Sequence, residues 1–378
     1  MASVLFLGGL GRSGTTLLER TLGELPGVVA LGEVVHLWQR DVRDNERCGC
    51  GTAFHDCPFW ARVGATAFDG WAGLDVSRVH ALRDAVERTR HIPALAGRRL
   101  SPRRRGDVLA YGAYYAAVYR AAAEVTGARV VVDSSKHSAL AHCLRWMHPG
   151  AIDLRVVQVV RDPRGVAHSW TRTVARPEAD GAEMTRYSPA RSALLWTAHN
   201  AALGLLARRD VPVTRVRYER FLADPATTVE ALADFAGLEL APGDLDFLGP
   251  THVDLDVGHS AAGNPMRFTV GRVTLRADDA WRGALPAADR YLVSALCAPL
   301  LRRYGYPLVP PARPRAAAPT PPRARHRRDA RPLPADARPA GDARPAGQDG
   351  RSGLPGAGPL PPDAVPAAHR PDTGRVVP

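Results

Sequence analysis

Lysine is almost absent from this sequence of 378 residues: Lys136 is the single example, against 49 arginines. No run of about 18 apolar residues occurs, which argues against a membrane-spanning helix. The apolar run at the N-terminus is very short and has no charged segment before it, so we interpret it as a first strand and not as a signal peptide. Only five cysteines are present, and their odd number without a secretion signal predicts reduced thiols in a cytoplasmic protein.

The positive charge is unevenly distributed along the chain. The formal net charge is +12 at pH 7, and half of that surplus comes from the twelve arginines and six aspartates that follow Pro310. The moderate surplus of the preceding part suits an anionic ligand better than a nucleic-acid track. The arginine bias itself is typical of a GC-rich genome. Against that bias, a retained lysine suggests that the compact ammonium of Lys136 is needed, with chance survival on a surface as the alternative.

The composition changes at Pro310. The remainder of the chain contains no aromatic residue, holds 17 of the 33 prolines, and repeats the six residues 336–341 at 342–347. Such a segment buries too little apolar surface to offset its conformational entropy. We therefore predict a domain at residues 1–309 and a disordered Pro/Arg/Ala-rich tail at residues 310–378. A solvated tail without a partner is favoured over one that contacts a membrane surface or nucleic acid.

Apolar strand candidates alternate with helical stretches in residues 1–309. The predicted strands are 4–8, 129–133, 154–160 and 213–216, and the predicted helices are 107–125, 138–147, 163–174 and 190–209. This alternation predicts an α/β fold with a parallel sheet of about four to five strands flanked by helices. Binding sites in such folds lie at the carboxyl ends of the strands. We expect the polar segments 11–16, 133–136 and 161–169 to converge there.

A glycine-rich loop separates the first predicted strand from the first helix. From Gly9 to Gly14 its spacing almost fits GxxxxGK[ST], but Thr15 stands in the lysine position and Arg12 lies inside the loop. The unpaired N–H groups and the dipole of a helix N-terminus create an anion site. The loop should therefore hold a phosphate-like group without the lysine of an ATPase.

A second motif follows the third predicted strand. Arg161 leaves the strand end, Asp162 can cap the next helix, Pro163 suits its first turn, and Ser169 lies two turns further on. An arginine and a hydroxyl in this arrangement can bind a second phosphate. A capped helix with a surface arginine is the alternative.

The two motifs, in this order and at this spacing, resemble the sulfotransferase family. Further matches are Gly32-Glu33, Tyr218-Glu219, Trp281 and the segment 303–306. The resemblance covers about residues 3–309. Within the family, the sequence most resembles a bacterial branch that is related to the tyrosyl-protein and carbohydrate-type sulfotransferases.

The resemblance implies a P-loop-like fold and the donor 3′-phosphoadenosine-5′-phosphosulfate. It implies donor-binding roles for Arg12, Ser13, Gly14, Thr15 and Thr16 at the phosphosulfate, Arg161 and Ser169 at the 3′-phosphate, and Tyr218 near the adenine. A sulfuryl group carries less negative charge than a γ-phosphoryl group, so fixed cations replace a magnesium clamp and we expect no metal to be required.

Three further residues are candidates for the chemistry. Glu33 is expected to be the base that deprotonates the acceptor hydroxyl, and His36, one helical turn away, is the alternative. Arg12 and Lys136 are expected to stabilise the charge that develops in the transition state. In the later segment 258–267, Ser260 is a candidate for assisting the leaving group and Arg267 for binding the 3′-phosphate, with an ordinary surface loop as the alternative.

Three cysteines lie close together at Cys48, Cys50 and Cys57, with His55 between them. Three thiolates and an imidazole can bind zinc, although C-x-C is tighter than the usual C-x₂-C. A disulfide to Cys57 is opposed by a reducing cytoplasm. We favour a structural insertion near the acceptor pocket and assign no metal ligand.

The sequence thus predicts a sulfotransferase that acts on a hydroxyl of a glycan, a glycolipid or a small molecule. The acceptor would lie against loops at residues 34–105 and 175–190. The first rival is a P-loop small-molecule kinase that uses ATP and magnesium, because Asp133 ends a strand as a magnesium-binding aspartate does. The second rival is a non-enzymatic module recruited through the basic tail. We expect neither a nucleic-acid partner nor a transmembrane segment.

Overall fold

The computed structural model describes residues 2–174 and 183–309. The predicted tail at residues 310–378 lies outside the described residues, as do residues 175–182 of the second predicted acceptor loop. The disordered tail, the acceptor role of residues 175–182 and the domain boundary at residue 309 therefore remain predictions. Within the described ranges, no helix combines the length and the apolar character that crossing a membrane requires.

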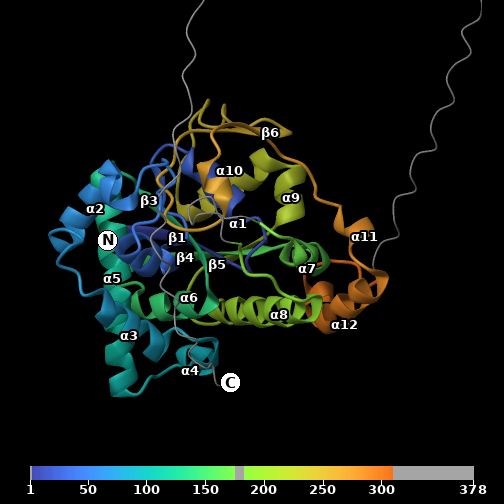
Figure 1. Ribbon diagram of the computed structural model, residues 1–378, viewed down its shortest axis with the longest axis horizontal. Coiled ribbons are helices and arrows are strands. Elements are labelled where there is room, and N and C mark those ends of the chain that lie inside the picture. The colour runs from blue at the N-terminus through green and yellow to red at the C-terminus, as the bar shows by residue number, and fades with distance from the viewer. Residues whose placement is uncertain (1, 175–182, 310–378) are drawn as a thin grey trace, which may run out of the picture. The chain divides into compact units, whose positions relative to one another are not determined.

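A five-stranded parallel sheet forms the centre of the described fold (Figure 1). The strands are β1 (Ala2–Gly8), β2 (Val28–Ala30), β3 (Val130–Lys136), β4 (Ile152–Val160) and β5 (Val213–Arg217). Their order in the sheet is β2-β3-β1-β4-β5, with every neighbouring pair parallel. The predicted α/β class and strand number are confirmed. The sequence pattern missed β2, because three residues are too few to produce an alternating pattern.

Helices cover both faces of the sheet. The main ones are α1 (Thr15–Gly23), α2 (Pro58–Phe68), α3 (Val76–Val86), α5 (Pro102–Thr126), α6 (Ser138–Leu144), α7 (Pro163–Thr171), α8 (Pro189–Leu206), α9 (Tyr218–Ala223), α10 (Pro225–Ala236) and α12 (Ala287–Arg303). Short helical turns are η1 (Val34–His36), η2 (Leu37–Arg43), η3 (Phe54–Asp56), η4 (Thr89–His91), α4 (Ile92–Leu95), η5 (Arg145–Met147), η7 (Pro265–Phe268) and α11 (Trp281–Ala284). Each of the four predicted helices is present, with ends shifted by a few residues. An antiparallel hairpin, β6 (His252–Leu255) and β7 (Gly271–Thr274), was not predicted.

Alternate residues of the strands pack into separate cores on the two faces. Val4 and Phe6 of β1 lie in the core that contains residues of α5, α6 and α8. Leu5 and Leu7 lie in the core that contains residues of α1, α9 and α10. These two groups of helices lie on opposite sides of the sheet in Figure 1. Because side chains alternate along a strand, this burial of both faces explains why the strands read as continuous apolar runs.

Each of the five strands ends at, or just before, a residue that the sequence analysis proposed for the site. The loop with Arg12 follows β1, Glu33 comes three residues after β2, Lys136 ends β3, Arg161 follows β4, and Tyr218 follows β5. Parallel strands bring their carboxyl ends to one edge of the sheet. The predicted convergence of three segments is therefore confirmed and extends to all five strands.

Candidate active site

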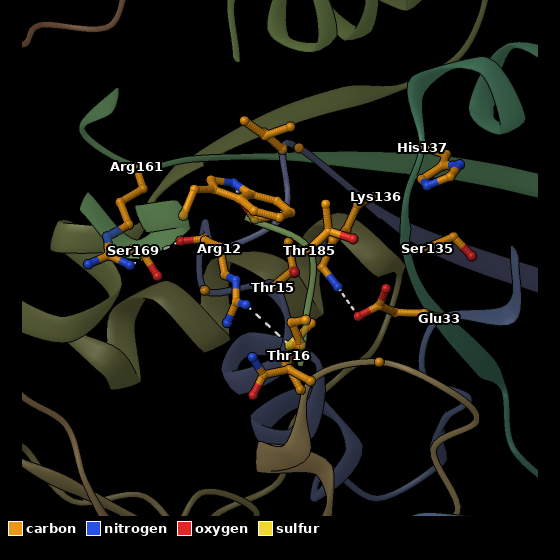
Figure 2. Close-up of a pocket in the computed structure, with 18 of the residues that line it drawn as sticks. Arg12, Thr15, Thr16, Glu33, Ser135, Lys136, His137, Arg161, Ser169 and Thr185 are labelled. Carbon is orange, nitrogen blue, oxygen red and sulfur yellow. Dashed lines mark hydrogen bonds and ion pairs between the residues drawn. The ribbon is translucent and has the colours of Figure 1, made fainter. Parts of the chain in front are cut away.

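A cavity of about 570 Å³ opens at the carboxyl edge of the sheet. Its lining includes nine of the predicted site residues: Arg12, Gly14, Thr15, Thr16, Glu33, Lys136, Arg161, Ser169 and Tyr218. In Figure 2, Arg12, Arg161 and Ser169 lie toward one side of this cavity, and Glu33, Lys136 and His137 lie toward the other. Among the predicted donor-binding residues, Ser13 is the one that is buried behind this surface.

The glycine-rich loop leaves several buried polar atoms without a partner. The Ser13 and Thr15 side chains are almost fully buried, and neither hydroxyl makes a hydrogen bond; the Arg12 Nε is unpartnered as well. Unpaired buried donors are costly, at about 1–3 kcal/mol each. They lie at the N-terminus of α1, where backbone N–H groups and the helix dipole favour negative charge. The loop therefore fits a bound anion such as a phosphosulfate.

The conformation of the loop depends on Gly14. Its φ is 88°, in the left-handed region, and a Cβ at this position would lie 2.2 Å from the Tyr218 ring. Arg12 also adopts a positive φ of 73°, which costs energy for a residue with a side chain. The fold thus pays for a turn that exposes N–H groups and directs the Arg12 side chain into the cavity.

Arg12 has only weak partners. Its guanidinium carbon lies 5.4 Å from the centre of the Trp170 ring, and one of its terminal nitrogens lies 3.2 Å from the Met184 sulfur. Burial lowers the pKa of Arg12, and the negative charge of Glu33 opposes this shift only in part. An incompletely compensated, half-buried cation favours an anionic ligand nearby.

Arg161 is held between the loop and an acidic residue. One guanidinium nitrogen donates to the Arg12 carbonyl at 3.0 Å, and the other donates to Asp278 at 2.9 Å. Its guanidinium carbon lies 5.1 Å from the centre of the Tyr218 ring. Arg161 and Ser169 line the same cavity, and Asp278 is paired with the arginine, so binding of a second phosphate here stays a prediction. No motif pointed to Asp278, which lies 117 residues further along the chain.

Glu33 and Lys136 form a direct ion pair at one end of the cavity. Lys136 ends β3 with a positive φ of 68°, and its side chain points toward Glu33 (Figure 2). Burial alone would raise the pKa of Glu33, but Lys136 and then His36 reverse this effect, so the pKa is lowered from its ordinary value. The side chain is therefore ionised at neutral pH. The lone lysine of the chain is buried and paired, so its survival on a solvated surface is excluded.

Histidines surround this ion pair. The His36 Nε2 lies 3.7 Å from Glu33, and the His137 Nδ1 lies 2.9 Å from the buried Glu87. Burial lowers the pKa of His36 to about 3, while hydrogen bonding to Glu87 overcomes burial and raises the pKa of His137. His36 is thus neutral and in reach of the cavity, as the alternative base requires.

Three residues from the sequence analysis have other roles in the structure. The buried Ser260 hydroxyl donates to Glu19 at 2.9 Å, and the buried Arg267 guanidinium donates to the Arg47 carbonyl at 2.9 Å. Both side chains are engaged with other groups, and neither is among the residues that line the cavity, which argues against both roles. Asp133 accepts from the Tyr119 hydroxyl at 2.5 Å and from the Ser135 N–H at 2.7 Å. It is absent from the cavity lining, where a magnesium-binding aspartate of a kinase would be needed.

Part of the second predicted acceptor loop contacts the glycine-rich loop and the Trp170 ring. Met184 contacts Arg12, and the Tyr187 ring stacks on Trp170 with centroids 4.4 Å apart. The Trp170 indole donates to the Gly11 carbonyl at 3.0 Å. An aromatic residue in a helix carries no sequence signal for such a contact, which depends on the packing of α7 against the loop.

Comparisons with known proteins identify sequences and structures that are similar to this chain. Residues 5–242 match the profile described as "Sulfotransferase family". Human carbohydrate sulfotransferase 3 is 27% identical over 174 residues, which are 42% of this chain and 34% of that protein. The chain therefore matches about a third of the length of this curated relative.

Two solved structures are similar to the chain. The sulfotransferase domain of the Synechococcus PCC 7002 olefin synthase is 22% identical, with a TM-score of 0.42, over 81% of this chain and 95% of that domain. The sulfotransferase domain of the curacin biosynthetic pathway is 16% identical, with a TM-score of 0.43, over 81% and 99%.

Proposed function

This chain belongs to the sulfotransferase family, and we propose that it transfers a sulfuryl group from 3′-phosphoadenosine-5′-phosphosulfate to a hydroxyl of a glycan, a glycolipid or a small molecule. The observation that carries the proposal is the pairing of two unlike sites in one cavity. An anion-binding loop with unpartnered buried donors faces a preformed lysine–glutamate pair.

The donor has two separate anionic ends, and the cavity offers two cationic sites. Arg12 and the N-terminal turn of α1, with Gly14, Thr15 and Thr16, would hold the phosphosulfate. Ser13 contributes to the same loop through its backbone and its buried hydroxyl. Arg161 and Ser169, which line the same cavity, would hold the 3′-phosphate, and Tyr218 would contact the adenine.

The acceptor end needs a group that removes a proton. As the acceptor oxygen forms its bond to sulfur, the bond between sulfur and the bridging oxygen of the 5′-phosphate breaks. Glu33 takes the acceptor proton, because it is ionised and lies in the cavity. Arg12 and Lys136 stabilise the negative charge that develops on the bridging oxygen.

Lys136 links the two ends electrostatically. In the structure its ammonium is paired with Glu33 and lowers the pKa of that carboxyl. When an anion enters the cavity, Lys136 shares its charge with the anion, so that burial then raises the pKa of Glu33. Glu33 becomes a stronger base only when the donor is present. This coupling suits a reaction in which an acceptor must not be deprotonated without a donor.

A P-loop kinase has less support. Thr15 occupies the position of the motif lysine, and Asp133 is held by Tyr119 and Ser135 away from the cavity. Fixed cations supply the charge stabilisation at this site, so the reaction should proceed without magnesium. The acceptor class rests on the match to a human carbohydrate sulfotransferase, which supports a glycan first. We expect the protein to act in the cytoplasm.

The proposal is tested with the full-length protein and a radiolabelled sulfuryl donor. A panel of glycan, glycolipid and phenolic acceptors is screened with and without a chelator. Label transfer that persists in the chelator supports the proposal. Transfer of label from γ-labelled ATP only in the presence of magnesium, with none from the sulfuryl donor, overturns it.

A further inference from the structure

Four potential metal ligands lie close together where the cysteine segment 48–57, which follows η2, meets a later loop. Cys48, Cys50, Cys57 and His259 each offer one ligand atom, and all four atoms lie within 4.8 Å of one another. Proximity in sequence made His55 the imidazole to consider beside these cysteines. In the structure the His55 ring nitrogen lies 2.9 Å from the Val42 carbonyl, and His259 supplies the imidazole from a loop about 200 residues away.

The separations of these atoms fit a tetrahedral ion. The sulfurs of Cys50 and Cys57 are 3.8 Å apart, and the His259 Nδ1 lies 3.3 Å from Cys57 and 3.8 Å from Cys48. Around zinc, bonds of about 2.3 Å to sulfur and about 2.0–2.1 Å to nitrogen give tetrahedral edges of about 3.8 Å and about 3.6 Å. A disulfide needs sulfurs about 2.0 Å apart, and all five cysteines are free thiols.

The backbone around the cysteines is shaped for this approach. Cys48 lies in a tight turn, in which its N–H donates to the Thr52 carbonyl and its carbonyl accepts from the Gly51 N–H. Gly49 donates to the Ser260 carbonyl at 3.0 Å, and a Cβ at Gly49 would lie 2.9 Å from the Gly258 carbonyl. The unusually short C-x-C spacing, with glycine in the middle, is therefore what lets the His259 loop reach the thiols.

The imidazole is also held in place. The Trp60 indole donates to the His259 carbonyl at 2.9 Å, and the His259 ring stacks on Phe59 with centroids 5.0 Å apart. Cys48 and Cys57 are fully buried. Fixed ring orientation and burial characterise ligands that are arranged for a metal before it binds.

We propose that Cys48, Cys50, Cys57 and His259 bind one Zn²⁺ ion in a closed structural site. Binding displaces the thiol protons to solvent, leaving three thiolates and a neutral imidazole on the ion, without any change in oxidation state. Four protein ligands leave no open position, so this ion takes no part in the transfer reaction.

The proposed ion joins the cysteine segment to a loop that borders the active site. Beyond His259 the chain runs beside the end of β2, where Ala261 donates to Leu31, and continues to Gly263. A Cβ at Gly263 would lie 2.7 Å from the Glu33 carboxylate, so this loop packs directly against the candidate base. The ion therefore fixes the wall behind Glu33, and it does so whatever reaction the cavity performs.

The test measures metal content in the full-length protein, purified reduced and without a metal resin. Elemental analysis should find about one zinc per chain, and chelation should lower the melting temperature by several degrees. Cobalt added to the chelated protein should produce the visible absorption of a tetrahedral thiolate site. Cys57→Ser and His259→Ala should each lose most of the zinc.

Two control variants separate this site from the alternatives. His55→Ala and Cys143→Ala should retain the full zinc content, because neither residue belongs to the cluster. If a cluster variant does not fold, Cys50→Ser, at the partly exposed position, is measured in its place. The proposal is overturned by a reduced wild-type protein that contains no zinc and gives no cobalt spectrum. It is also overturned by a Cys50–Cys57 disulfide in mass spectra, or by loss of zinc in His55→Ala but not in His259→Ala.

Discussion

The two ends of the cavity differ in whether their polar groups have partners. At the anion end, formed by Arg12, Ser13, Thr15 and Arg161, three buried donor atoms have no partner. At the ion-pair end, formed by Glu33, Lys136, His36 and His137, the charged groups are already matched to one another or to Glu87. Both ends lie at the same edge of one sheet, so the difference comes from side chains and not from architecture.

This difference separates binding from chemistry. Unpaired buried donors destabilise the empty site, and an anion that satisfies them gains that energy as affinity. A matched ion pair gains little from a new ligand, but its charges respond when one partner is drawn away. We therefore expect substitutions at the anion end to weaken donor binding, and substitutions at the ion-pair end to lower turnover while the donor still binds.

The largest effect is expected for Glu33→Gln. The amide keeps the shape of the side chain but cannot accept the proton, so kcat should fall by about 10²–10⁴-fold. Donor affinity, measured by calorimetry, should change little. His36→Gln is the matched control, since it removes the alternative base one turn away. Full activity in Glu33→Gln, with a large loss in His36→Gln, would reassign the base.

Lys136→Met tests the electrostatic link between the two ends. Turnover should fall by about 10²–10³-fold, as for loss of one transition-state donor. The pH profile of the residual activity is the sharper measure. In the free wild-type enzyme, Lys136 keeps the pKa of Glu33 below its ordinary value of 4.5, so kcat/KM for the donor, which reports the free enzyme, should persist down to acidic pH. Without Lys136, burial dominates, the pKa of Glu33 rises, and the acid limb moves to higher pH.

A Lys136→Arg variant serves as the control for that shift. It keeps the positive charge, so the acid limb should stay near the wild-type position even if turnover falls. An unchanged acid limb in Lys136→Met would mean that the ion pair does not set the protonation of the base.

The sequence predicted where the site residues lie in the fold much better than it predicted which residues pair with them. Four strands, the anion loop and Arg161 follow from local patterns, namely apolar runs, glycine spacing and a capped helix start. The pairing of Glu33 with Lys136 spans 103 residues, and that of Arg161 with Asp278 spans 117. Such contacts depend on how strands are ordered in the sheet. For the same reason His55, and not His259, was considered beside the cysteines, because proximity in sequence was the only guide.

Arg161→Ala tests the anion end of the cavity, where we expect a loss of donor affinity and not of turnover. Losing a charge-assisted hydrogen bond costs about 1.5–3 kcal/mol, or roughly a 10–150-fold weaker donor affinity. The value of kcat at saturating donor should change far less than in Glu33→Gln. Calorimetric titration with adenosine 3′,5′-bisphosphate measures the affinity without turnover. A large fall in kcat with unchanged affinity would place Arg161 in the chemistry and remove the distinction between the two ends.

The smallest expected effect is that of Asp278→Asn, and its sign is opposite. Asp278 is 39% exposed and pairs with the guanidinium that a phosphate would need, so a donor must compete with it. Exposed ion pairs contribute about 0.2–1 kcal/mol, so removing this charge should tighten donor binding by at most about fivefold. Asparagine can still accept from the Ala280 N–H, which keeps the local turn. The gain should shrink at high salt, where the pair is screened, and it should disappear in an Arg161→Ala background. Weaker binding in Asp278→Asn would show instead that the carboxylate positions Arg161 for the donor.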